Sequence, residues 1–150
     1  MGEVDILISG GTILTLDENE TKIEDGALAI KGDTISAFGS SKEIELLYSG
    51  EKTINARGCL VMPGIVNGHT HAAMTCFRGL ADDLELMNWL NNYIFPAEAK
   101  NVNEELVYWG SLLACAEMIR SGTTTFCDMY IFEDETAKAA KKAGMRCLLG

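Results

Sequence analysis

The chain has 150 residues, of which 47% are hydrophobic and 23% charged, as in a globular protein of about one domain. Its formal net charge of −10 argues against nucleic acid and anionic membranes as partners, because both require a basic face. The N-terminal stretch lacks the pattern of a signal peptide, and no apolar run approaches the roughly 18 residues of a membrane span.

Residues 1–58 have the pattern of a small β module. Short β-rich runs alternate with turn residues, and Gly10–Gly11 between the first two runs predicts a hairpin turn. The segment SSKEIELLYSG predicts a short amphipathic helix capped by Ser40 or Ser41. The predicted strands are VDILIS, GTILTL, Ala27–Ile30, Thr34–Phe38 and KTINARG.

The pattern changes at Cys59. The run CLVMPGIVNG is almost wholly apolar, which is typical of a strand buried on both faces of a parallel sheet, and we expect the strand at 64–68. Two helices follow, at Leu84–Tyr93, ended by Pro96, and at Glu104–Arg120, where Trp109 is expected to pack in the core. The remaining elements are a strand in TTTFCDMY, a helix in FEDETAKAAKKAG and a strand in MRCLLG.

This alternation of strands and helices indicates a parallel α/β fold. A complete (β/α)8 barrel needs about 250 residues, whereas the segment 59–150 holds 92. We therefore expect residues 59–150 to form only the first two to three βα units of such a barrel, within a longer protein.

Five widely spaced cysteines occur without any CxxC pair. An odd number of cysteines without close pairs is typical of reduced thiols, so we expect a cytoplasmic protein without a disulfide framework. We also expect most of these thiols to be buried, because they lie in apolar stretches.

The stretch PGIVNGHTHAAMT contains the only two histidines, His69 and His71. Side chains two residues apart project from the same face of a strand, so the two imidazoles can converge on one metal ion. A metal held by two histidines keeps positions open for water, whose pKa falls to about 7 on zinc. The alternative is a histidine buried in the core beside a solvent-exposed one.

Three further residues are candidates for the site. Asp128 ends the TTTFCD strand, where it could orient a ligand or substrate, or cap the following turn. Glu98 lies in the connection after the first barrel strand, where substrate contacts arise, although a solvated glutamate is the simpler interpretation. Trp89 lies in the same connection and could line a pocket or pack in the core.

The run GCLVMPGIVNGHTHAAMTCFRGLADDLELMNWLNNYIFPAEA closely resembles the start of the catalytic barrel in the amidohydrolase superfamily. Within it, the sequence looks most like the 5-methylthioadenosine/S-adenosylhomocysteine deaminases. The resemblance extends over the whole chain, from DILISGGTILTLD to the final EMIRSGTTTFCDMY motif.

This resemblance implies a metal-dependent-hydrolase TIM barrel flanked by a small β-sandwich. It also implies one divalent metal, zinc or iron, with His69 and His71 as the first ligands. Glu98 matches the residue that receives the ribose hydroxyls, and Trp89 matches a tryptophan beside the 5′ side of the substrate. The family's other ligands and its catalytic glutamate have no counterpart here, so the 150-residue chain alone is expected to be inactive.

The expected activity of the longer protein is hydrolytic deamination of the adenine ring in such nucleosides. A guanine deaminase or chlorotriazine hydrolase of the same subgroup is the alternative enzyme, and a catalytically incomplete fragment or non-enzymatic domain is the alternative outside enzymes. The expected partner is a small nucleoside, and relatives of this type are often homo-oligomers.

Overall fold

A computed structural model describes all 150 residues and divides them into two compact units, Met1–Pro63 and Gly64–Gly150. The sequence places the boundary earlier, after residue 58. The observed boundary lies later because Leu60–Val61 pairs in parallel with Thr12–Ile13 and so belongs to the sheet of the first unit.

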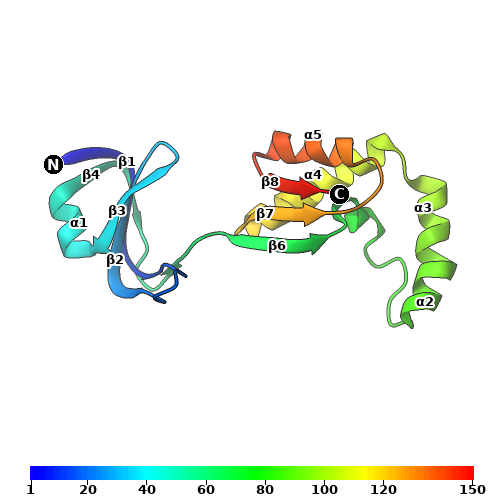
Figure 1. Ribbon diagram of the computed structural model, residues 1–150, viewed down its shortest axis with the longest axis horizontal. Helices are drawn as coiled ribbons and strands as arrows, with labels where there is room; N and C mark the ends of the chain where they lie inside the picture. Colours follow the sequence, from blue (N-terminus) through cyan, green and yellow to red (C-terminus); the bar gives the residue numbers. More distant parts are fainter. The chain divides into compact units, whose positions relative to one another are not determined.

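The first unit is one five-stranded sheet with a short helix (Figure 1). Strand β1 pairs antiparallel with β2 and parallel with β4, and β3 pairs with β2. The Ser40 hydroxyl accepts a hydrogen bond from the N–H of Glu43, which confirms the predicted helix cap. The elements are β1 (Gly2–Leu14), β2 (Lys22–Lys31), β3 (Thr34–Ser40), α1 (Ser41–Leu47), β4 (Tyr48–Asn55) and β5 (Leu60–Val61).

The hairpin predicted at Gly10–Gly11 is wrong, because β1 runs without a turn through both glycines. Gly10 has φ of +81°, and the pairing register with β2 shifts between Ser9 and Gly11. A glycine in this conformation inserts an extra residue as a β-bulge, which bends the strand while the pairing continues on both sides.

The second unit carries three parallel strands in the order β6-β7-β8, which confirms the parallel α/β prediction for this segment. In Figure 1 their arrows point the same way. The continuous helical segment from α2 through η2 to α3, called the α2–α3 rod, lies beyond the tips of these arrows. The elements are β6 (Ile65–Thr70), η1 (Ala72–Phe77), α2 (Leu86–Trp89), η2 (Leu90–Ile94), α3 (Phe95–Asn101), α4 (Glu104–Arg120), β7 (Thr123–Asp128), α5 (Glu133–Ala143) and β8 (Arg146–Leu149).

The core of the second unit joins α4 and α5 to one face of this sheet. Phe126 of β7 is fully buried against Cys115 and Met118 of α4 and Ala140 of α5. In β8, Cys147 and Leu149 pack against this cluster, whereas Leu148 between them is 70% exposed. This alternation is the period of two expected of a strand with one covered face.

The apolar run CLVMPGIVNG contains the strand expected at 64–68, which the structure places at Ile65–Thr70 as β6. Its first part forms β5 in the first unit and its second part forms β6 in the second, on either side of Pro63. Val66 of β6 is 64% exposed, because the helices α4 and α5 cover only one face of the sheet.

Helix α4 has the predicted bounds, and Asn103 caps it by accepting from the N–H of Leu106. Its buried face differs from the prediction, since Trp109 is 60% exposed. The face that packs is built of small residues, which let the helix approach its neighbours closely. The buried residues of α4 are Val107, Gly110, Ser111, Ala114, Cys115 and Met118.

Neither α4 nor any other helix combines the length and the apolar composition needed to cross a bilayer.

The predicted helix end at Pro96 is also wrong, because α2, η2 and α3 run continuously to Asn101. A π-turn precedes the proline, with the Phe95 N–H bonded to the carbonyl of Leu90. A proline ring normally meets the carbonyl four residues before it. The wider turn relieves this clash, so the helix continues beyond the proline.

Burial divides the cysteines, all of which are free thiols. Cys115 is fully buried, and burial raises its pKa to about 11. Cys59 and Cys76 are exposed, so the expectation that most thiols are buried is only partly correct.

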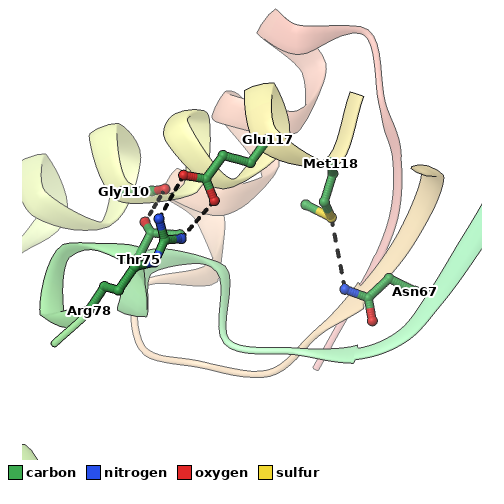
Figure 2. A network of polar contacts seen from close by, with 6 residues as sticks. All are labelled: Asn67, Thr75, Arg78, Gly110, Glu117 and Met118. Atoms are coloured by element: carbon green, nitrogen blue, oxygen red, sulfur yellow. Dashed lines mark hydrogen bonds and ion pairs between the residues drawn. The ribbon is translucent and has the colours of Figure 1, made fainter. Parts of the chain in front are cut away.

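Two polar contacts and one close approach fix α4 against η1 and against Arg78, which follows η1; Figure 2 shows the two polar contacts, from Thr75 and from Arg78. The Thr75 hydroxyl donates to the Gly110 carbonyl at 2.8 Å, and Arg78 forms a bidentate ion pair with Glu117 at 2.7 and 2.9 Å. A Cβ atom on Gly110 would lie 2.7 Å from the Ala73 carbonyl oxygen. Only glycine therefore permits this close approach of helix and loop.

We predict that Gly110→Ala lowers the free energy of unfolding of the full-length protein by about 1–3 kcal/mol, because the added methyl overpacks the contact. Glycine to alanine within a helix normally stabilises by up to about 1 kcal/mol, so the sign is diagnostic. Chemical denaturation measures the effect, with the exposed Ala116→Ser as control, expected within about 0.5 kcal/mol of wild type. A more stable Gly110→Ala variant would contradict the packing argument.

Candidate functional site

The two histidines meet at the carboxyl end of β6. His69 is the fifth residue of the strand, and His71 follows the strand end with φ of −124° and ψ of 77°. Their ring centroids are 5.1 Å apart, and the ring planes are inclined by 78°. His69 is exposed and His71 is half-buried, so neither imidazole lies in the core.

A backbone carbonyl fixes the tautomer of His71. Its Nδ1 lies 2.6 Å from the carbonyl oxygen of Met129, which follows β7. Because a carbonyl only accepts, Nδ1 carries the proton and donates, and the lone pair lies on Nε2. A hydrogen bond from the ring nitrogen that does not bind the metal is the usual support of a metal-ligating histidine.

Asp128 holds the backbone just after His71. Its Oδ1 accepts a hydrogen bond of 2.8 Å from the N–H of Ala72, and its side chain is buried. Burial raises the pKa of Asp128 to about 6, although the bond from Ala72 opposes this shift. Its Oδ2 is buried without a hydrogen-bond partner. The observed role is to connect β7 to the segment after β6, rather than to cap its own following turn.

A cavity of about 400 Å³ lies beside His71. Its walls are mainly apolar, and its polar side chains are His71, Glu98 and Tyr130. Trp89 and Glu98 both line this cavity from the α2–α3 rod. Glu98 lies on helix α3, within the connection after the first barrel strand where the sequence placed it. The remaining lining residues are Met74, Leu86, Leu90, Ile94, Phe95, Met129 and Ile131.

Sequence reasoning did not identify Tyr130 as a site residue. Its hydroxyl donates to Oε1 of Glu98 at 2.7 Å, across 32 residues of sequence. Burial raises the pKa of the Tyr130 hydroxyl, and the bond to Glu98 raises it further, so the group is a donor at neutral pH. The available signal was its place two residues after the end of a parallel strand, where functional side chains gather.

The donors present fit a divalent transition metal in part. Two imidazoles suit zinc or iron, and the hydrogen bond to Met129 leaves Nε2 of His71 able to bind. A small cavity of about 190 Å³ adjoins both rings and is also lined by Asp128. No group of three or more His, Cys, Asp or Glu side chains in the 150 residues is arranged to hold a metal. The metal donors that this chain brings together at the candidate site are therefore the imidazole nitrogens of His69 and His71.

A larger cavity of about 460 Å³ lies in the first unit. Its lining is polar but includes no imidazole or thiol, the nitrogen and sulfur ligands that most often bind a transition metal. We therefore assign the site to the second unit, where both histidines lie. The lining residues of the larger cavity are Ser9, Gly10, Asp25, Ser41, Lys42, Glu45, Thr53, Asn55 and Arg57.

Comparison with known families matches residues 60–150 to the amidohydrolase family. The chain belongs to this family. It is 67% identical to 5-methylthioadenosine/S-adenosylhomocysteine deaminase 1 of Syntrophus aciditrophicus, over all of this chain and 34% of that protein. It is 51% identical to a 5′-deoxyadenosine deaminase of Methanosarcina mazei, over 97% of this chain and 32% of that protein.

Solved structures agree with this assignment. An adenosine deaminase from Xanthomonas campestris, with bound zinc, superposes with a TM-score of 0.92 at 37% identity. The match covers 98% of this chain and 34% of that structure. The chain thus has the fold of the corresponding part of an amidohydrolase, and it spans about a third of the length of the curated relatives it matches.

We predict that His69→Ala or His71→Ala weakens zinc binding of the full-length protein by more than about 100-fold, because each removes a nitrogen donor. Metal analysis after dialysis against a zinc buffer measures the effect. Glu98→Gln is the matched control, since it changes a cavity residue outside the histidine pair and should retain zinc. Full zinc occupancy in both histidine variants would rule out this metal site.

Proposed function

We propose that the full-length protein containing this chain is a metal-dependent hydrolytic deaminase of 5′-modified adenosines, such as 5-methylthioadenosine or S-adenosylhomocysteine. The observation that carries the proposal is the histidine pair at the end of β6, with His71 held by the Met129 carbonyl at 2.6 Å. The names of the relatives, 5-methylthioadenosine/S-adenosylhomocysteine deaminase and 5′-deoxyadenosine deaminase, support the substrate class.

The proposed reaction replaces the exocyclic amine of adenine with oxygen. Water adds to the ring carbon bearing the amine, the carbon–nitrogen bond breaks, and ammonia leaves with a proton taken from the water. A bound divalent cation supplies Lewis acidity and lowers the pKa of water towards neutrality, and zinc is the expected ion, with iron as the alternative. The zinc in the Xanthomonas campestris structure supports this choice.

Residues of this chain then hold the parts of the site in place. His69 and His71 would hold the cation, and the hydrogen bond to Met129 leaves Nε2 of His71 able to bind it. Glu98 accepts hydrogen bonds from the ribose hydroxyls, and Trp89 lines the side of the cavity that takes the 5′ substituent. Fixing the ribose fixes the attached base, which places its reacting carbon.

The proposed architecture of the full-length protein is a (β/α)8 barrel that continues the β6-β7-β8 sheet, flanked by a β-sandwich to which the first unit contributes one layer. A three-stranded parallel sheet with helices on one face is the expected start of such a barrel. The acidic net charge of −10 supports a small-molecule substrate over nucleic acid. We propose a homo-oligomer in the cytoplasm.

We predict that Glu98→Gln lowers kcat/KM for 5-methylthioadenosine by about 10–100-fold, the usual effect of losing a charged hydrogen-bond acceptor. Deamination of free adenine by the same enzyme, where measurable, should change by less than about threefold, since it has no ribose. Ammonia release measures both rates in the zinc-loaded protein.

The same assay separates the alternatives. Equal losses on nucleoside and free base would show that Glu98 does not bind the ribose. A wild-type enzyme that acts on guanine or a chlorotriazine, but on no adenosine, would overturn the substrate class. Absence of any hydrolysis in the metal-loaded, full-length protein would overturn the enzyme proposal.

A further inference from the structure

Three consecutive residues at the end of β7 each contact a different part of the site. Asp128 accepts from the Ala72 N–H at 2.8 Å, and the Met129 carbonyl accepts from His71 at 2.6 Å. Tyr130 donates to Glu98 at 2.7 Å. The first two contacts fix the segment around the histidines, whereas the third reaches the α2–α3 rod.

The hydrogen bond from the Tyr130 hydroxyl connects this segment to the carboxylate of Glu98. Along the chain, the α2–α3 rod is connected to the histidine segment through η1 and then through residues 78–85, which lie outside helices and strands. Met129 N–H also bonds to the carbonyl of Thr70, at 3.3 Å, which anchors the residue before Tyr130 to β6. The position of the Tyr130 hydroxyl is therefore set by the same backbone that orients His71.

The geometry of the pair leaves part of Glu98 free for a ligand. Tyr130 occupies Oε1, and Oε2 makes no hydrogen bond within the chain. A carboxylate has about four lone-pair positions, so Oε2 and the second lone pair of Oε1 can accept two neighbouring hydroxyls. A hydroxyl donor to a carboxylate is a strong hydrogen bond, and it restricts the rotation of a flexible glutamate side chain.

We propose that Tyr130 is a specificity-determining positioning residue, which holds the Glu98 carboxylate in the orientation that accepts a vicinal diol of the substrate. This inference rests on the proposed function, because it assigns the diol to the ribose of an adenosine. Tyr130 acts through Glu98 and makes no contact with the reacting carbon. It thereby favours ribonucleosides over substrates without the two hydroxyls.

The test uses Tyr130→Phe in the full-length, zinc-loaded enzyme, since this change removes only the hydroxyl. The substrates are 5-methylthioadenosine and its 2′,3′-dideoxy analogue, and both kcat and KM are measured. We expect kcat/KM for the diol substrate to fall about tenfold or more, chiefly through KM, because the diol is remote from the reacting carbon. The dideoxy analogue should react within about twofold of the wild-type rate.

Two controls separate positioning from a general structural effect. Tyr93→Phe removes a tyrosine hydroxyl from the α2–α3 rod that carries Glu98, at an exposed position outside the cavity, and should leave the rates on both substrates unchanged. In the double variant Glu98→Gln/Tyr130→Phe, the loss on the diol substrate should not exceed that of Glu98→Gln alone, because Tyr130 acts through Glu98.

Equal losses on both substrates, additive losses in the double variant, or no loss in Tyr130→Phe would each overturn the positioning role. These outcomes leave deamination by the wild-type enzyme intact, so they are distinct from failure of the proposed function. A wild-type enzyme that deaminates neither substrate would overturn the proposed function, and the inference with it.

Discussion

The contact between His71 and the Met129 carbonyl is the constraint on which the rest of the site depends. It joins the ends of two adjacent parallel strands, and at 2.6 Å it determines which nitrogen of the imidazole carries the proton. Without it, the ring of His71 could rotate, and either nitrogen could face the metal position. The proposed binding of a cation and the placement of the cavity wall both follow from this one backbone group.

The supporting scaffold explains why this contact is held. The segment after His71 packs against α4 at Gly110, where a side chain would collide with the Ala73 carbonyl. Asp128 fixes the next N–H, of Ala72, from the opposite strand. The ion pair of Arg78 with Glu117 is solvent-exposed, and screening by water makes such a pair a weak constraint, so close packing rather than charge sets the position of the loop.

Sequence patterns predicted several of the local elements, because these depend on neighbouring residues. The helix Glu104–Arg120 and its Asn103 cap follow from side chains that bond within one turn. The buried face of that helix could not be predicted from Trp109 and the other large apolar residues, since small residues determine the approach to η1. Likewise, Gly10 permits either a turn or a bulge, and pairing with β2 on both sides decides for the bulge.

The bond between Tyr130 and Glu98 lay beyond those patterns for a related reason. Glu98 reaches the cavity from a helix that continues past Pro96, where the sequence indicates an end, and the π-turn that permits this is a tertiary adjustment. An isolated glutamate on such a helix has the features of a solvated surface residue. Its partner comes from another strand end, and only the fold brings the two together. Since one segment after β7 contacts both His71 and Glu98, the spacing between a metal and a ribose would be set by a single stretch of backbone.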